Sequence, residues 1–472
     1  MRSPKERLLD ALEAWQRERA RERVARWRGD ADALDEVAVS SRHARLRGPR
    51  ARELYEDALD RGDLEGDERV AVEAALREAY VTGPRALGDA RIAAALAAPI
   101  PYDSDFHRGS DLLLRLAVRP DGRTRRAIAR ALERTFTDML GGLEERRGRV
   151  EEALELAAWL PAPPASAPVD AEQVLAETDE AWRELLERLA HAGGAHPEDW
   201  SDLVHLLRAP AWDDLVPRRS RPRRASAPLE ELGFGEVLRR GAHVEPSHGG
   251  ARAEIAIVAP SRDVRLAGGV ELGVASERDF ARALGAAAAC LLAHPGLPTV
   301  LGRPAAHSVA DAIGALCGHL LSDGRYVARA FGDLSPAQVR AARELALGVE
   351  LFELRTAAAA HLGHAQLGRA GFVDEARDRL VRTWGVDAPP ALASLVARDP
   401  GATARLAAAR LAPARARALR EQFDEDFWRN PRTAEPLRHG ASRGAALTPD
   451  AWAAELGVPE GALRARMTEL LG

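Results

Sequence analysis

The sequence has 472 residues, of which 46% are hydrophobic and 29% are charged, and this composition excludes wholesale disorder. Acidic residues number 72 and basic residues 67, so the formal net charge of −5 argues against a general nucleic-acid-binding protein. Two cysteines exclude a disulfide-stabilised scaffold and indicate a reducing compartment.

We expect neither an export signal nor a membrane span. The opening residues 1–15, MRSPKERLLDALEAW, contain no apolar stretch of signal-peptide length. The longest uncharged apolar run, at about 283–293, is too short to span a bilayer. The expected location is therefore the cytoplasm, with no membrane partner, and the sequence does not set an oligomeric state.

Helical periodicity dominates the chain. Leu8, Leu12 and Trp15 recur at helical spacing near the start. Stretches rich in Ala, Leu, Glu and Arg follow, and these residues are strong helix formers. The stretches cover 66–80, 123–139, 144–159 and 171–190.

A proline-rich segment interrupts this pattern with the letters LPAPPASAP. It predicts an N-terminal helical region at 1–160, a linker or loop at 161–170, and a second helical region at 171–472. Within the second region, Ser335-Pro336 and Thr448-Pro449 are typical helix starts, in which a hydroxyl cap precedes a proline at the first helical position.

Five arginines crowd the segment PRRSRPRR at 217–224. An anion or nucleic-acid patch is one interpretation. Isolated charge runs are usually solvated, so we predict a solvated loop here.

The strand signal is concentrated at 252–275, where apolar residues alternate in three short runs separated by Pro260 and Gly268-Gly269. The runs are Ile255–Ile257, Val264–Leu266 and Val270–Leu272. They predict a small β-ribbon within a mainly α-helical protein. The preceding segment HVEPSH, 243–248, is predicted to be a surface loop because glycines follow it.

The short motifs of common enzyme classes are missing from the sequence. It has no Walker loop, no GxGxxG opening a βαβ unit, no GxSxG elbow and no CxxC, and HExxH occurs nowhere. Cys290 and Cys317 lie in apolar helical patterns, where a thiol is usually inert. No residue therefore stands out as a nucleophile.

The order of segments nevertheless carries a family resemblance. Along the chain stand VLAETDEAWRELLERLA at 174–190, WSDLVHLLRAPAWDDLVP at 200–217, APSRDVRLAGG at 259–269, ERDFARALGAAAACLLAH at 277–294, SVADAIGALCGHLLSD at 308–323, LFELRTAAAAHLGHAQL at 351–367 and REQFDEDFWRNPRTAEPLRHGASRG at 420–444. This succession resembles bacterial relatives of the thimet oligopeptidase and oligoendopeptidase F zinc metallopeptidases. The resemblance covers roughly 170–472 and is clearest over 255–325.

The resemblance implies a large helical fold with a deep cleft between two helical halves. In that family the helix after the β-ribbon carries HExxH: two histidines four residues apart bind zinc, and the glutamate beside the first is the general base. A glutamate from a later helix completes the metal site, and a tyrosine near the C-terminus stabilises the oxyanion.

In the family an acid-aromatic pair precedes HExxH, and Asp279-Phe280 matches that pair here. The match locates the positions in this sequence that correspond to HExxH and form a vestigial motif. Counting from this pair places the two histidines at Gly285 and Ala289 and the base at Ala286, to within one residue. Asp311 replaces the later glutamate, and we expect the four positions to converge on one wall of the cleft.

The residues at these positions cannot perform the family's chemistry. Glycine and alanine neither donate a lone pair to a metal nor take a proton from water, and a lone carboxylate does not hold zinc firmly. The segment ATARLAAARL, 402–411, lacks the oxyanion tyrosine. The resemblance thus implies a catalytically inactive protein without metal or cofactor, whose former active-site cleft binds peptides or a protein partner.

One alternative is an active metallohydrolase with a relocated zinc site, although the candidate ligands lack the compact spacing of zinc sites. These candidates are Cys290, His294, Asp311, Cys317 and His319.

Another alternative is a DNA-binding regulator that uses the helix pair at 448–471, with Arg464 and Arg466 on the second helix. We favour a structural role for this pair because an αα-hairpin is common and the net charge is negative. No nucleic-acid partner is therefore expected.

Overall fold

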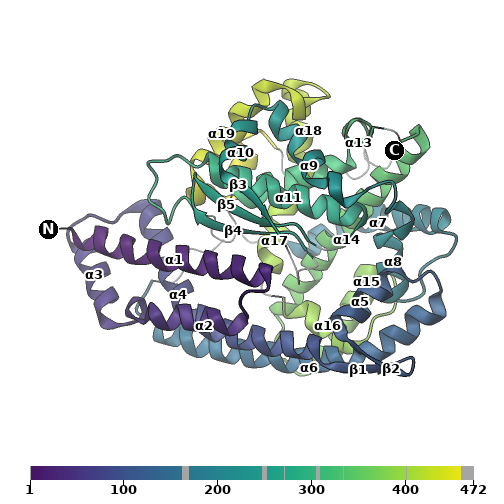
Figure 1. Cartoon of the computed structure of the whole chain (residues 1–472), viewed down its shortest axis with the longest axis horizontal. Coiled ribbons are helices and arrows are strands. Elements are labelled where there is room, and N and C mark those ends of the chain that lie inside the picture. Colours follow the sequence, from purple (N-terminus) through teal and green to yellow (C-terminus); the bar gives the residue numbers. More distant parts are fainter. Residues whose placement is uncertain are drawn as a thin grey trace.

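The computed structural model describes residues 2–161, 169–246, 252–269, 272–303, 309–332, 334–399 and 401–458. The protein is mainly α-helical, as predicted, with two small β-sheets (Figure 1). Among the described residues, no helix is both long enough and apolar enough to cross a membrane.

The N-terminal helices extend along the left and lower sides of the molecule in the view of Figure 1. They are α1 (Pro4–Arg28), α2 (Ala33–Arg42), α3 (Pro49–Asp60), α4 (Gly66–Ala97), α5 (Gly109–Val118) and α6 (Gly122–Leu156). The helices predicted at 123–139 and 144–159 are one helix, α6, which packs against α4. A Cβ atom at Gly88 would lie 2.3 Å from Cβ of Arg146, so glycine permits the close approach of these two helices.

The hairpin of β1 (Pro99–Tyr102) and β2 (Asp105–Arg108) was not expected from the sequence. Its two strands are only four residues long, which is too short for a clear alternation. Asp103 and Ser104 form the turn with φ angles of 54° and 65°. Asp-Ser is a weak turn signal beside Asn-Gly or Asp-Gly, which explains the omission.

The second region begins with four helices that lead into a three-stranded sheet. The elements are α7 (Ala171–Gly193), α8 (Trp200–Arg208), α9 (Arg221–Glu231), α10 (Gly235–Gly241), β3 (Ala242–Glu245), β4 (Glu254–Ala259) and β5 (Asp263–Ala267). The strand order is β3-β5-β4, with β3 parallel and β4 antiparallel to β5. β4 is therefore an edge strand.

This sheet confirms the predicted β-ribbon and corrects its limits. The first two predicted runs are β4 and β5, but Leu272 is the N-cap of a helix rather than part of a strand. The segment at 243–245, predicted as a surface loop, belongs to β3, and Glu245 is buried. Residues 247–248 of the predicted loop and residues 270–271 lie outside the described residues.

Helices account for most of the remaining described chain. They are α11 (Gly273–Leu292), α12 (Val309–His319), α13 (Gly324–Phe331), α14 (Pro336–His364), α15 (Phe372–Trp384), α16 (Pro390–Ala397), α17 (Ala402–Ala409), α18 (Ala412–Phe423), α19 (Ala434–Ser442) and α20 (Pro449–Glu455). The predicted starts of α14 and α20 are confirmed: Ser335 and Thr448 cap them, each followed by proline.

The largest hydrophobic cluster draws on both sides of the proline-rich segment. It joins Ile100 and Phe136 to Trp182 and Trp384, so region 1–160 does not pack as a unit separate from 171–472. A second cluster lies within the N-terminal helices. A third, small cluster places α1 on one face of the sheet, where Val24 meets Val258.

The arginine-rich run at 217–224 is solvated only in part: Arg218, Arg219 and Arg223 are exposed, as predicted, but the other two arginines are not. α9 begins at Arg221, which is fully buried, and Arg224 is also buried. Both guanidinium groups contact the carboxylate of Glu277, with N–O distances of 2.8 Å. For these two arginines the prediction was wrong, because a buried counter-charge 56 residues away cannot be read from a local charge run.

Candidate active-site cleft

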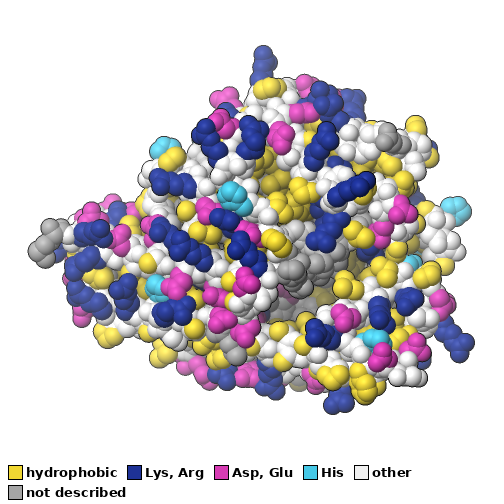
Figure 2. Space-filling model, in the orientation of Figure 1, with side chains coloured by type: hydrophobic (Ala, Val, Ile, Leu, Met, Phe, Trp, Pro, Cys, Tyr) yellow, Lys and Arg dark blue, Asp and Glu magenta, His cyan; other side chains and the backbone are white. Residues whose placement is uncertain are grey.

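A large cleft lies between the N-terminal helices and the second half of the chain. It comprises two adjoining cavities of about 790 and 730 Å³, which share lining residues such as Arg19, Ile255 and Asp311. Helices α1, α4, α11, α12 and α17 and the edge strand β4 supply its walls. Figure 2 shows this face of the molecule hollowed near its centre, close to the place of α17 in Figure 1.

Three residues of α11 line the cleft: Arg282, Ala283 and Ala286. Their spacing is i, i+1 and i+4, which places the first and last on one helical face. Asp311 and Ala315 of α12 line the same cavity. These five side chains form one wall of the cleft.

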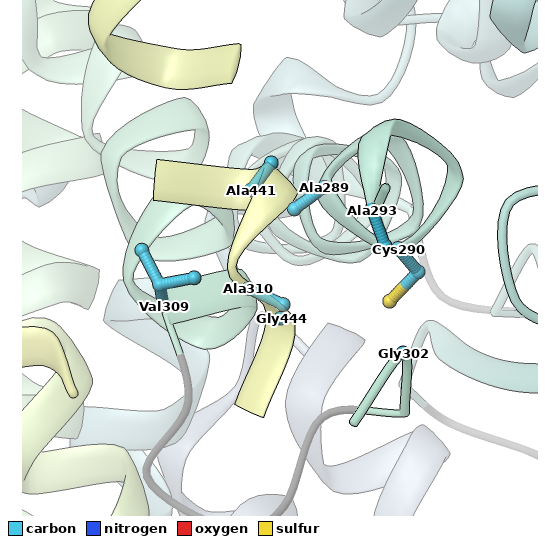
Figure 3. Close-up of a pocket in the computed structure, with 8 residues that line it drawn as sticks. All are labelled: Ala289, Cys290, Ala293, Gly302, Val309, Ala310, Ala441 and Gly444. Carbon is cyan, nitrogen blue, oxygen red and sulfur yellow. The ribbon is translucent and has the colours of Figure 1, made fainter. Parts of the chain in front are cut away.

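The predicted convergence of four positions is wrong for two of them. Ala286 and Asp311 do share the cleft, but Gly285 faces α12, where an added Cβ would lie 2.6 Å from Sγ of Cys317. Ala289 lines a separate cavity of about 10 Å³ and points toward Ala441 of α19 (Figure 3).

The i, i+1, i+4 spacing that HExxH needs occurs twice among the cavity-lining residues of α11 and its C-cap. Ala289, Cys290 and the C-cap residue Ala293 line the small cavity of Figure 3. Arg282, Ala283 and Ala286 line the large cleft, which they share with the carboxylate of Asp311.

These side chains do not fit zinc. Arg282 presents a cation, which forms an ion pair with Asp279 at 3.2 Å, and the two alanines have no donor atom. Asp311 alone supplies a carboxylate. In the described part of the chain, no three His, Cys, Asp or Glu side chains are grouped so that they could hold a metal ion.

The five residues of the alternative zinc site are not brought together. Cys317 contacts the Gly285 position, whereas Sγ of Cys290 points toward Gly302 in the small cavity of Figure 3. His319 is buried and lies 2.9 Å from the carboxylate of Glu350. His294 Nδ1 accepts a hydrogen bond from the amide of Gly296 at 3.0 Å.

In their buried, protonated state, both thiols are poor metal ligands and poor nucleophiles. Burial raises the pKa of Cys290 to about 12, and the nearby charge of Asp311 adds to the effect. Burial also raises the pKa of Cys317 to about 12. Because only a thiolate is reactive, these pKa values argue against a cysteine nucleophile.

The cleft is rich in arginine, which sequence reasoning did not detect because the residues come from distant segments. Eight arginines and five carboxylates line it, an excess of three positive charges. The arginines are Arg19, Arg23, Arg26, Arg85, Arg146, Arg282, Arg303 and Arg405, and the carboxylates belong to Glu36, Glu78, Asp89, Glu254 and Asp311.

Most of these arginines are held by carboxylates. Arg19, for example, contacts Glu36 at 2.6 Å and Glu78 at 2.9 Å. Arg23 and Arg303 differ, since they donate to main-chain carbonyl oxygens of β4 instead. They stand out from the other cleft arginines for this reason.

The C-terminal helix pair is only partly described. Its first helix, α20, is packed into the protein through Trp452, which is fully buried and lies beneath the guanidinium of Arg415. Arg464 and Arg466, the predicted DNA contacts, lie outside the described residues. α20 is thus anchored in the protein core through Trp452.

The whole chain superposes on solved peptidase structures at low sequence identity. PZ peptidase A with an inhibitor matches with a TM-score of 0.62 at 8% identity, covering 93% of this chain and 84% of that one. A protein assigned as oligoendopeptidase F matches with a TM-score of 0.61 at 12% identity, with the same coverage. BsuCP gives 0.60 at 14% identity and covers 99% of both chains.

At the level of sequence, no protein-family model and no curated protein matches this chain. The likeness is therefore one of three-dimensional structure, and identities of 8–14% establish the fold alone. This chain has the helical fold of the oligoendopeptidase F and PZ peptidase structures, over nearly its full length.

Proposed function

We propose that this protein is a catalytically inactive relative of the metallopeptidases with this fold, and that it binds peptides in the cleft. The observation that carries the proposal is the residue set at the cleft-facing i, i+1 and i+4 positions of α11. Arg282, Ala283 and Ala286 occupy them, in a fold whose solved examples include peptidases.

The missing groups are the ones that peptide hydrolysis requires. A zinc-bound water needs several neutral or anionic ligands and a general base close by. Ala283 cannot serve as the base, and Arg282 would repel a divalent cation. α17, whose segment was expected to carry an oxyanion tyrosine, contributes Ala404, Arg405 and Ala408 to the cleft.

The cleft retains features suited to peptides. Its larger cavity, about 790 Å³, lies within the range of sites that enclose a ligand. β4 borders both cavities, and an edge strand offers backbone groups to an extended chain. Apolar Ile255 and Ile257 lie beside charged groups, a mixture that suits both backbone and side chains of a peptide.

The first test is the zinc content and peptidase activity of the purified chain, dialysed without chelator. We expect a zinc content near zero and no hydrolysis of fluorogenic peptides with or without added zinc. A zinc content near one per chain would overturn the proposal and favour the alternative site built from Cys290, Cys317 and their neighbours.

We propose that the former metal site lay in the large cleft, at the register of Arg282, Ala283 and Ala286, and a rebuilt motif tests this register directly. The variant R282H/A283E/A286H/D311E places two imidazoles and two carboxylates on the cleft wall, and we expect it to take up about one zinc ion per chain.

The matched control places the same residue types in the register counted from the sequence, as G285H/A286E/A289H/D311E. We expect no zinc uptake, because a side chain at 285 collides with Cys317. Zinc uptake by this control but not by the first variant would refute our register.

A further inference from the structure

Charge distinguishes the cleft from the rest of the protein. The whole chain has a formal charge of −5, yet the cleft lining carries three more positive than negative side chains. Positive charge gathered in a concave surface of an acidic protein favours an anionic ligand, because the low-dielectric walls focus the potential.

For two of the cleft arginines, the hydrogen bonds within the described residues go to main-chain carbonyl oxygens and not to carboxylates. Arg23 of α1 donates from Nη1 to the carbonyl oxygen of Ile255 at 3.4 Å. Arg303 donates from Nη1 to the carbonyl oxygen of Ile257 and from Nη2 to that of Val258 at 3.0 Å. Nε of Arg303 is buried without any hydrogen-bond partner.

These guanidinium groups are held in an unfavourable environment. Burial lowers the pKa of Arg303 to about 10, and burial together with the charge of Arg19 lowers that of Arg23. Both guanidinium groups remain protonated at neutral pH, at the cost of desolvating a charge. The nearby charges of Glu254 and Glu36 offset part of this cost for Arg23, and that of Glu13 does so for Arg303. A carboxylate is the partner that a planar guanidinium accepts best, through paired N–H···O bonds.

The two arginines are spaced along one edge of the sheet. Their acceptors, Ile255 and Ile257, are two residues apart on β4, about 7 Å at the rise of a strand. Side chains at positions i and i+2 of an extended peptide lie on one side of the peptide at the same spacing.

We propose that the cleft selects acidic peptides, in which carboxylates at alternate positions of an extended segment bind Arg23 and Arg303 beside β4. This inference rests on the proposed peptide-binding function and specifies its ligand class. The carboxylates replace the carbonyl oxygens as partners of the guanidinium groups, so the freed oxygens at 255 and 257 can accept N–H donors from the bound peptide.

The test is a fluorescence-anisotropy titration of the full-length chain with four fluorescein-labelled octapeptides. They are alternating Gly-Glu, alternating Gly-Gln, alternating Gly-Arg, and a block of four glutamates followed by four glycines. We expect the alternating glutamate peptide to bind at least tenfold more tightly than the glutamine peptide, and more tightly than the block peptide.

Variants assign this preference to residues. Arg23→Gln and Arg303→Gln should each weaken binding of the acidic peptide about tenfold, the effect of losing one charge-assisted hydrogen bond. Arg240→Gln is the control, since it removes the same charge from a side chain that is 79% exposed on α10. Arg23→Glu should shift the preference toward the arginine peptide, so the test holds even if Arg303→Gln fails to fold.

The outcomes separate the inference from the function on which it rests. Equal affinity for the glutamate and glutamine peptides would overturn acidic selectivity and leave peptide binding intact. Binding of none of the four peptides would overturn both. An acidic preference that Arg240→Gln reduces as much as Arg23→Gln would reflect general electrostatics and would also refute the assignment.

Discussion

Gly285 of α11 and Cys317 of α12 are in such close contact that a Cβ atom on the glycine would lie 2.6 Å from the cysteine sulfur. The same atom would lie 2.8 Å from Cβ of Cys317 and 3.1 Å from Cα of Gly314. This contact joins the two helices that line the cleft, and it faces away from the cleft. Position 285 is therefore part of the packing between α11 and α12.

The contact predicts that Gly285→Ala destabilises the fold, although alanine is the better helix former by about 1 kcal/mol. Overpacking a tight contact costs about 1–3 kcal/mol, so we expect a net loss of about 1 kcal/mol in the free energy of unfolding. Adding Cys317→Ala should recover part of the loss by removing the sulfur. Urea denaturation of the two single variants and the double variant measures this coupling.

The matched control is Gly148→Ala in α6, where an added Cβ meets no atom within 4 Å. There the helix preference acts alone, and the substitution should stabilise the protein by up to about 1 kcal/mol. Equal effects at 148 and 285 would contradict the packing described here.

The sequence predicted more of the fold than of the candidate site. The order of segments indicated the helical metallopeptidase-like architecture, and the alternation at 255–257 and 264–266 located β4 and β5. The site depends on which face of α11 meets the cleft. Residues 281–292 contain no His or Glu to mark that face, so a count from Asp279-Phe280 could not assign it, and the count put Gly285 in the site although Gly285 packs against Cys317.

The burial of the charged residues could not be predicted from the sequence either. Sequence reasoning took the arginines of 217–224 as solvated, and it gave no reason to single out Arg23 or Arg303. Tertiary neighbours set the environments of the buried arginines: Glu277 for two arginines of 217–224, and the carbonyl oxygens of β4 for Arg23 and Arg303. A buried charge is identified by its partners, which a single sequence does not pair.

Glu277 is the buried centre of the pair Arg221 and Arg224, and its removal should be costly. Glu277→Gln removes the carboxylate charge that both buried guanidinium groups contact, so we expect a loss of about 3–5 kcal/mol in the free energy of unfolding. Glu236→Gln is the control, because its partner Arg240 is exposed and such pairs contribute about 0–1 kcal/mol. Guanidinium chloride denaturation compares the two, and similar losses would show that the buried cluster is not held by charge.

Glu353 should make the free energy of unfolding depend measurably on pH in the acidic range. Burial raises the pKa of its carboxyl group, but the charges of Arg278, Arg252 and Arg282 outweigh burial and bring the pKa down to about 2. A carboxyl group with a depressed pKa stabilises the fold fully above its unfolded pKa, about 4.5, and loses that contribution as the pH falls toward 2.

The comparison that isolates this effect is the difference in unfolding free energy between the native chain and Glu353→Gln at several pH values. We expect a difference on the order of 3 kcal/mol at pH 7, nearly the same at pH 5, and clearly smaller at pH 3. Glu421→Gln, at a side chain that is 63% exposed, should give a small difference with little change over this range. A difference for Glu353→Gln that stays constant from pH 7 to pH 3 would mean that its carboxylate is not stabilised by the three arginines.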